Sequence, residues 1–211
     1  DIDGRVGAGE LRARRCTRST SRGAGVTLCK LYLGGCVGLT DVSALAGHAA
    51  LHTLSLAKCV ALTDVSGLAS CAALHTLSLG ETSVSDITAL ANCAVLHTLS
   101  LRQTSVSDVM PLANCASLHT LYLGKCVALT DVSALASCGA LQEIDLSKCP
   151  GLTDISALAG CVALQTLDLS ESGVTDLSVL AGCATLHSLN LSETGVMDVS
   201  ALTARRYTLS K

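Results

Sequence analysis

Residues 51–73 read LHTLSLAKCVALTDVSGLASCAA, and residues 74–95 repeat the pattern as LHTLSLGETSVSDITALANCAV. Self-similarity at a fixed spacing of about 20 to 50 residues is the mark of a solenoid or a related repeat array. Cutting the chain at the first Leu of each copy gives eight units, followed by a short tail at residues 208–211. The units cover residues 28–50, 51–73, 74–95, 96–117, 118–140, 141–163, 164–185 and 186–207.

Each unit combines the signature of a short strand with that of a short helical turn. The opening LxxLxL places Leu54 and Leu56 in alternation with polar residues, as in a half-buried strand. An Asp follows the next turn in every unit, where its carboxylate can cap backbone N–H groups of a short helix. These structural aspartates are Asp41, Asp64, Asp86, Asp108, Asp131, Asp154, Asp176 and Asp198. Because one unit cannot bury an apolar face alone, the units must stack, with their strands in one parallel sheet.

The pattern LxxLxLxx(C/T/S)…D(V/I)xxL, from about Leu28 to Tyr207, resembles the short leucine-rich repeats of the internalin and phosphatase-regulator type. This resemblance implies an α/β fold, a leucine-rich-repeat solenoid curved as a right-handed superhelix. Its parallel β-sheet would be concave, with short α- or 3-10-helical turns on the convex side. The recurrent wording DVSALA.C.ALHTL is also similar to leucine-rich-repeat proteins of trypanosomatid parasites.

The chain departs from the usual repeat at the position normally filled by Asn. The longer units carry Cys there and the shorter units carry Thr or Ser. Both make fewer side-chain hydrogen bonds than Asn, so we expect a weaker ladder between units. The residues concerned are Cys36, Cys59, Cys126 and Cys149 in the longer units and Thr82, Thr104, Ser172 and Thr194 in the shorter ones.

Composition narrows the function classes. The chain is 49% hydrophobic but has only three Tyr and no Phe or Trp, so it lacks the aromatic platform that single-stranded nucleic acid requires. We therefore do not expect nucleic acid as a partner. No uncharged stretch reaches the ~18 apolar residues of a membrane span. The formal net charge of −3 conceals an Arg-rich leader, residues 1–27, expected to be a poorly ordered arm or an incomplete cap.

The Cys and His residues recur with the repeats. Cys71, Cys93, Cys115, Cys138, Cys161 and Cys183 replace a core Leu, so we interpret them as buried thiols that act as small apolar groups. Unpaired thiols favour a reducing compartment and hence a cytoplasmic location. A surface or secreted location is the alternative, with the basic leader of an adhesin binding host protein or a sulfated glycan.

A row of histidines occupies the second position of five units: His52, His75, His97, His119 and His187. Such a row can share a transition metal, act as a pH switch, or simply occupy a partly exposed edge of the sheet. We favour the edge position and expect neither a metal nor a cofactor.

Positions three, five, seven and eight of each unit should project from the concave side. The candidate partner-binding residues, which include three of the histidines beside these positions, are Tyr32, Lys58, His75, His97, Arg102, His119, Tyr122, Glu143, Asp145, Asp168 and Glu171. The C-terminal half of this face is acidic, so it should prefer a basic partner surface. Asp145 and Asp168 could form an acid–base pair or a cation site, but an open sheet lacks the water-excluding pocket that makes such groups reactive. We therefore expect a non-enzymatic scaffold that binds another protein.

Overall fold

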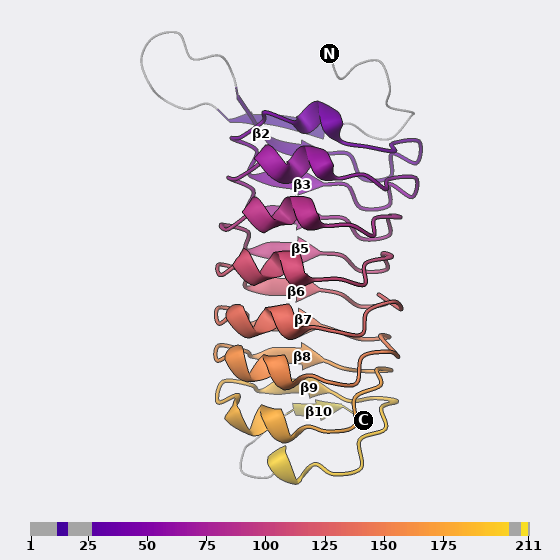
Figure 1. Ribbon diagram of the computed structural model, residues 1–211, viewed down its shortest axis with the longest axis vertical. Coiled ribbons are helices and arrows are strands. Elements are labelled where there is room, and N and C mark those ends of the chain that lie inside the picture. The colour runs from indigo at the N-terminus through magenta and orange to yellow at the C-terminus, as the bar shows by residue number, and fades with distance from the viewer. Residues whose placement is uncertain (1–11, 17–26, 203–207, 211) are drawn as a thin grey trace.

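The computed structural model describes residues 12–16, 27–202 and 208–210, and it is a single stack of similar coils. One wall of the stack is a ten-stranded sheet in which every strand pairs with its neighbours in sequence, and the opposite wall is a row of short 3-10 helices (Figure 1). The strands are β1 (Arg12–Cys16), β2 (Thr27–Tyr32), β3 (Thr53–Ser55), β4 (Thr76–Ser78), β5 (Thr98–Ser100), β6 (Thr120–Tyr122), β7 (Glu143–Asp145), β8 (Thr166–Asp168), β9 (Ser188–Asn190) and β10 (Thr208–Ser210). The helices are η1 (Ser43–Leu45), η2 (Ser66–Ser70), η3 (Thr88–Asn92), η4 (Met110–Asn114), η5 (Ser133–Ser137), η6 (Ser156–Gly160), η7 (Ser178–Gly182) and η8 (Ser200–Leu202).

The eight predicted units each supply one strand, β2 to β9, and these strands are all parallel. The repeat sets the register, because equivalent residues such as Thr53, Thr76 and Thr98 lie side by side on neighbouring strands. The predicted solenoid with a concave parallel sheet and helical turns on the convex side is confirmed, and the described helices are of the 3-10 type.

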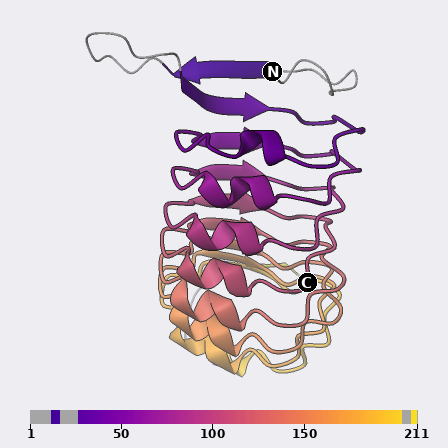
Figure 2. The same cartoon turned by 45° about the horizontal axis from the view of Figure 1, so that its top comes forward.

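The two outermost strands were not predicted. In the leader, β1 runs antiparallel to β2, with an irregular register between Arg14 and Arg15 (Figure 2). In the C-terminal tail, β10 continues the parallel sheet beside β9. The rest of the leader, which we expected to be a poorly ordered arm or an incomplete cap, lies outside the described residues apart from Thr27. Among the described residues, no helix has the length and apolarity to cross a bilayer.

The core is a set of apolar columns that run the length of the stack. The unit at residues 51–73 buries Leu51, Leu54, Leu56, Cys59, Leu62, Val65, Leu68 and Cys71, and the neighbouring units bury the equivalent positions. Burial of one Leu side chain stabilises the folded state by about 1.5–3 kcal/mol. Because each side chain is covered by the units on either side, the apolar columns stabilise the stack as a whole.

Aspartates organise the start of every helix. In each unit the Asp lies one residue before the helix N-cap, and its Oδ1 accepts the N–H two residues on, as from Thr88 to Asp86 at 2.8 Å. This backbone bond, aided by the side chain of the same partner, lowers the pKa of Asp86, Asp154 and Asp198. Pro111 lies in the first turn of η4, where a backbone N–H is not needed.

Candidate functional site

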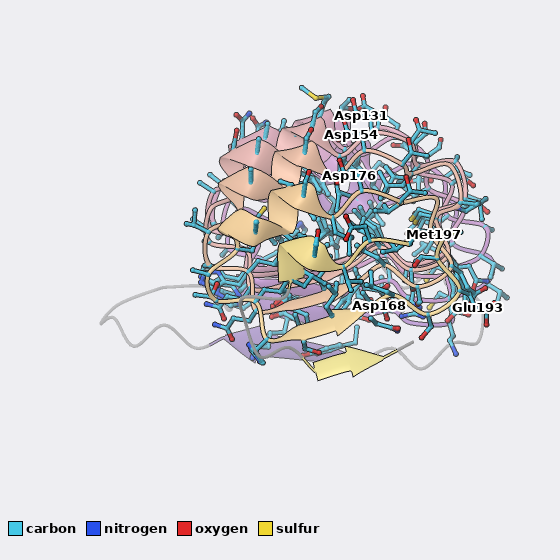
Figure 3. The ribbon with its side chains drawn as sticks, turned by 90° about the horizontal axis from the view of Figure 1, so that it is seen from below. Asp131, Asp154, Asp168, Asp176, Glu193 and Met197 are labelled. Atoms are coloured by element: carbon cyan, nitrogen blue, oxygen red, sulfur yellow. The ribbon has the colours of Figure 1, made fainter. Side chains whose placement is uncertain are left out.

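The outward face of the sheet is built from two rows of side chains that alternate with the buried Leu row. Figure 3 separates the two sides of the molecule, with Asp168 beside the strands and Asp131, Asp154 and Asp176 beside the helices. The third position of each unit forms the row Lys30, Thr53, Thr76, Thr98, Thr120, Glu143, Thr166 and Ser188. The fifth position forms the row Tyr32, Ser55, Ser78, Ser100, Tyr122, Asp145, Asp168 and Asn190. The candidate residues Tyr122, Asp145 and Asp168 therefore lie side by side on β6, β7 and β8.

Asp145 forms an ion pair that spans three units. Arg102 Nη1 donates to Asp145 Oδ2 at 2.7 Å, although the unit that contains β6 lies between these two residues. Gly124 makes this bridge possible, because a Cβ at that position would lie only 2.6 Å from Asp145 Oδ2. The Asp145 side chain is 11% exposed and the Arg102 side chain 49% exposed. The pair therefore joins a largely buried carboxylate to a guanidinium that remains open to a ligand.

The acidic residues of this face also have partners in their own turns. Asp145 Oδ1 accepts the N–H and the hydroxyl of Ser147, and Asp168 Oδ1 accepts the same two groups of Ser170. Asn190 makes the equivalent pair of bonds in the next unit. These bonds fix the side chains against the sheet and leave only part of each carboxylate available to a partner.

Tyr122 contributes to the same local network. Its hydroxyl donates to Glu143 Oε1 at 3.0 Å. Burial raises the pKa of Tyr122, and the bond to Glu143 raises it further, so the phenol stays protonated near neutral pH. Sequence reasoning named these residues and placed Glu143 beside Asp145, but it did not predict the Arg102–Asp145 ion pair or the Tyr122–Glu143 hydrogen bond. The repeat relates equivalent positions of neighbouring units, whereas each of these contacts joins different positions.

The eighth position of each unit forms a third row, in which the backbone is left-handed. Seven non-glycine residues have φ between 55° and 64°: Lys58, Glu81, Gln103, Lys125, Lys148, Glu171 and Glu193. Their side chains interact along the stack, as in the ion pairs Lys58–Glu81 at 3.9 Å and Lys148–Glu171 at 2.5 Å. This row places residues of both charges along one border of the sheet, with two neighbouring cations at Lys125 and Lys148 and two neighbouring anions at Glu171 and Glu193.

A shallow depression of about 380 Å³ opens on the concave face between this border and the strands. It arises where Ala57, Ser78, Gly80 and Ser100, small residues at positions five and seven, lie beside Arg102 and the longer side chains of the eighth position. The lining consists of Ala57, Ser78, Gly80, Glu81, Ser100, Arg102, Gln103 and Lys125. Sequence analysis did not predict this depression, although it named Arg102 as a candidate.

At the opposite border of the sheet, four of the histidines form a column. Ring centroids are 4.6 Å apart for His52 and His75, 3.8 Å for His75 and His97, and 4.8 Å for His97 and His119, with nearly parallel planes. Nδ1 of His97 lies 2.8 Å from the carbonyl of Val95. Burial lowers the pKa of His75, and the neighbouring histidines lower it further. In the described part of the chain, no group of three or more His, Cys, Asp or Glu side chains is placed to hold a metal ion.

The cysteines form two buried columns. In the first, Cys59 Sγ and Cys126 Sγ each donate to a Leu carbonyl of the preceding unit at 3.1 Å. In the second, Cys138 and Cys161 donate to Leu112 and Leu135 in the same manner. Burial raises the pKa of Cys93 to about 11 and that of Cys115, Cys149 and Cys161 to about 12, so these thiols are protonated and unreactive at neutral pH.

No known protein-family profile matches the sequence, and no curated protein matches it. Solved structures do match the fold. An internalin (inlF) of Listeria monocytogenes is 27% identical with a TM-score of 0.76, over 88% of this chain and 56% of that one. Internalin C2 of the same organism is 26% identical with a TM-score of 0.75, over 87% of this chain and 81% of that one.

A leucine-rich-repeat protein of Leptospira interrogans is 14% identical with a TM-score of 0.62, over 82% of this chain and 52% of that one, which bears on the fold alone. The chain thus spans little more than half the length of the inlF structure. None of these structures supports the trypanosomatid resemblance. The repeated coils and the parallel sheet make this chain a leucine-rich-repeat solenoid in its fold, similar to the solved internalin structures.

Proposed function

We propose that the chain is a non-enzymatic scaffold that holds another protein against the outward face of β3 to β9. The observation that carries this proposal is that the face is uncovered, because none of the described elements lies over it (Figure 3). It offers hydroxyl, aromatic and charged side chains in fixed rows on a stiff sheet. A rigid surface of this kind loses little conformational entropy when it binds a partner.

The C-terminal half of this face suits a basic region of the partner. Asp168, Glu171 and Glu193 lie on neighbouring units, and Lys148 is the cation paired with Glu171. Asp145 contributes less negative charge than the sequence suggests, because Arg102 is bonded to it. Exposed ion pairs on the border of an interface act mainly on specificity and on the rate of association.

The test places a bulky side chain on the concave face of the sheet or, as a control, on the opposite, helical side of the molecule. Ser100→Tyr fills the depression with a neutral ring, and Tyr122 in the same row is a precedent for that side chain. Ser137→Tyr places the same ring at the exposed end of η5 on the opposite side. Peptides selected from a displayed random library against the unmodified protein should bind Ser100→Tyr about tenfold or more weakly and Ser137→Tyr unchanged. Equal affinity for both variants would assign binding to another face.

We further propose that the protein works in a reducing compartment. Nine described cysteines are buried free thiols: Cys36, Cys59, Cys71, Cys93, Cys115, Cys126, Cys138, Cys149 and Cys161. Structural proteins of oxidising compartments ordinarily pair their cysteines. Expression with a cytosolic and with a secreted tag should give soluble protein only in the first case; efficient secretion of fully reduced, folded protein would argue against this location.

A further inference from the structure

The depression on the concave face has the chemistry of an anion subsite. Arg102 and Lys125 contribute two cationic side chains to its lining, against the single carboxylate of Glu81. Glu81 is itself within 3.9 Å of Lys58 Nζ. The lining therefore carries an excess of positive charge in the N-terminal half of a face whose C-terminal half is acidic.

Arg102 is positioned to bind a second carboxylate. Its bond to Asp145 uses Nη1 alone, whereas a guanidinium carries five N–H donors on a planar fork. Asp145 is in turn fixed by the N–H and the hydroxyl of Ser147, so the guanidinium is anchored from a largely buried point. About half of the Arg102 side chain remains exposed beside the depression. Anchoring of this kind lowers the entropic cost of binding a ligand.

The floor supplies neutral donors. Ser78 and Ser100 line the depression, and neither hydroxyl has a hydrogen-bond partner among the described residues. Lys125 stands at the border, 3.5 Å from Gln103 Oε1, and is not ion-paired within the described part of the chain. A carboxylate in the depression would thus meet the two cations Arg102 and Lys125. It would also meet the hydroxyls of Ser78 and Ser100, which donate to no other acceptor among the described residues.

We propose that this depression binds the side-chain carboxylate of an Asp or Glu in an extended segment of the partner protein. The inference rests on the proposed function and specifies the partner more closely. Glu171 lies three units from Arg102, or about 14 Å along the stack at ~4.8 Å per strand. An extended chain covers that distance in about four residues at ~3.3 Å each. The bound segment therefore carries an acidic residue and, about four positions away, a basic one.

The experiment selects displayed random peptides on the unmodified protein and on charge variants. Arg102→Gln/Asp145→Asn removes both charges of the ion pair together. The amide introduced at position 145 can keep the bonds to Ser147, because Asn190 in the same row already makes the equivalent bonds to Ser192. Lys125→Gln is combined with these two changes to remove the second cation. Lys148→Gln is the matched control, since it removes a cation from the same row one unit beyond the depression.

Peptides selected on the unmodified protein should share an acidic residue and should lose at least about tenfold in affinity on the triple variant, because charge-assisted hydrogen bonds are lost. Lys148→Gln should keep the acidic preference. Synthetic versions should weaken when the acidic residue becomes its amide and should tolerate amidation of the peptide C-terminus.

Selected peptides without an acidic residue, or with equal affinity for the triple variant, would overturn the inference. Dependence on a free C-terminus would likewise assign the depression to a terminal carboxylate. Ser100→Tyr distinguishes failure of the concave scaffold from failure of the carboxylate subsite. If it abolishes binding of peptides that lack acidic residues, the concave scaffold stands and the carboxylate subsite fails; if it leaves all peptides bound, the concave scaffold itself fails.

Discussion

One position that recurs in every unit, the one normally filled by Asn, illustrates how the choice of side chain alters the coupling between repeats. In the longer units, a Cys such as Cys59 donates to a carbonyl of the preceding unit, Leu33 O at 3.1 Å. In a shorter unit, Thr82 instead donates to Leu79 O of its own unit at 2.7 Å. The replacement of Asn thus produces two kinds of hydrogen bond. Cys59 bonds to the preceding unit, whereas Thr82 bonds within its own unit. Ser172 makes neither kind of bond, because its buried Oγ has no partner among the described residues.

Ser172→Thr should stabilise the protein. Thr104 and Thr194 at the same position donate to the carbonyl three residues earlier at 2.7 and 2.8 Å, so a Thr at 172 can donate to Leu169 O. A satisfied hydrogen bond contributes about 0.5–1.5 kcal/mol to stability. The midpoint of urea unfolding should therefore rise.

The reciprocal change, Thr104→Ser, is the matched control and should lower the midpoint. A midpoint for Ser172→Thr at or below that of the unmodified protein would mean that the site has no room for the methyl group.

At the same scale, the sequence predicts some contacts and not others. The aspartate before each helix recurs in every unit, so its capping role could be read directly from the repeat. The Arg102–Asp145 ion pair occurs once, joins different columns and depends on Gly124, whose missing side chain carries no sequence signal for a charge partner. Contacts that do not follow the repeat can therefore be identified only from the three-dimensional structure.

Among the elements, the histidine column at the start of β3 to β6 should respond to pH. Stacked neutral imidazoles make favourable contacts, but neighbouring imidazolium ions repel one another. The column ends where Gln142 and Gln165 occupy the equivalent position, and His187 beyond them belongs to a separate unit. Gln is consequently a replacement that this position already accepts.

We expect stability to fall on mild acidification through His75. Its pKa in the folded protein is below the ordinary value of 6.5, so the unfolded chain binds more protons between the two pKa values. The stability contributed by neutral His75 is fully present above pH 6.5 and decreases as the pH falls toward the lowered pKa. Urea unfolding at a series of pH values measures this slope.

His75→Gln should flatten that slope, whereas His187→Gln, outside the stacked column, should leave most of it in place. An NMR titration in which the His75 ring changes protonation at or above 6.5 would contradict the expected order.

A second element-scale property concerns the cysteine columns. Burial raises the pKa values of Cys115 and Cys161 to about 12, and the thiolate rather than the thiol is the form that attacks a disulfide reagent. At pH 8 these thiols should react with a disulfide reagent only as fast as the protein opens, and rapidly in urea. Mass mapping of labelled peptides would identify each site; fast labelling of Cys115 in the native protein would show that the column opens locally.

For the whole molecule, the stack behaves as a one-dimensional series of similar layers. Its length and the parallel order of its strands followed from the repeat, because every unit must present the same apolar columns to the next. The end strands did not. The leader strand β1 has no counterpart in the repeat, and β10 reads TLS like β3, β4 and β5 but lies in the segment that the sequence analysis treated as a tail. The outward rows could be placed from the sequence, but the depression depends on how side chains of several units lie together.

Deletion of residues 74–95 should therefore leave a folded protein. The cut removes one complete unit, and β3 can pair with β5 in the register it now has with β4. Unfolding should remain cooperative, with a lower midpoint and a urea m-value roughly one-eighth smaller, because less surface is exposed. Deletion of residues 74–84 is the control, because half a unit puts strand against turn and should abolish folding. A collapse of the complete-unit deletion would show that the layers are not interchangeable.

The left-handed turn residues have a consequence for how the molecule can diversify. Glycine would relieve a conformational penalty of about 1–2 kcal/mol at each, yet Lys58, Glu81 and Lys125 keep charged side chains there. These side chains point away from the apolar columns, so exchanging one charge for another leaves the core untouched. The eighth position of each unit can therefore change its side chain while the core of the repeat stays the same. Successive units can in this way acquire different ligand preferences.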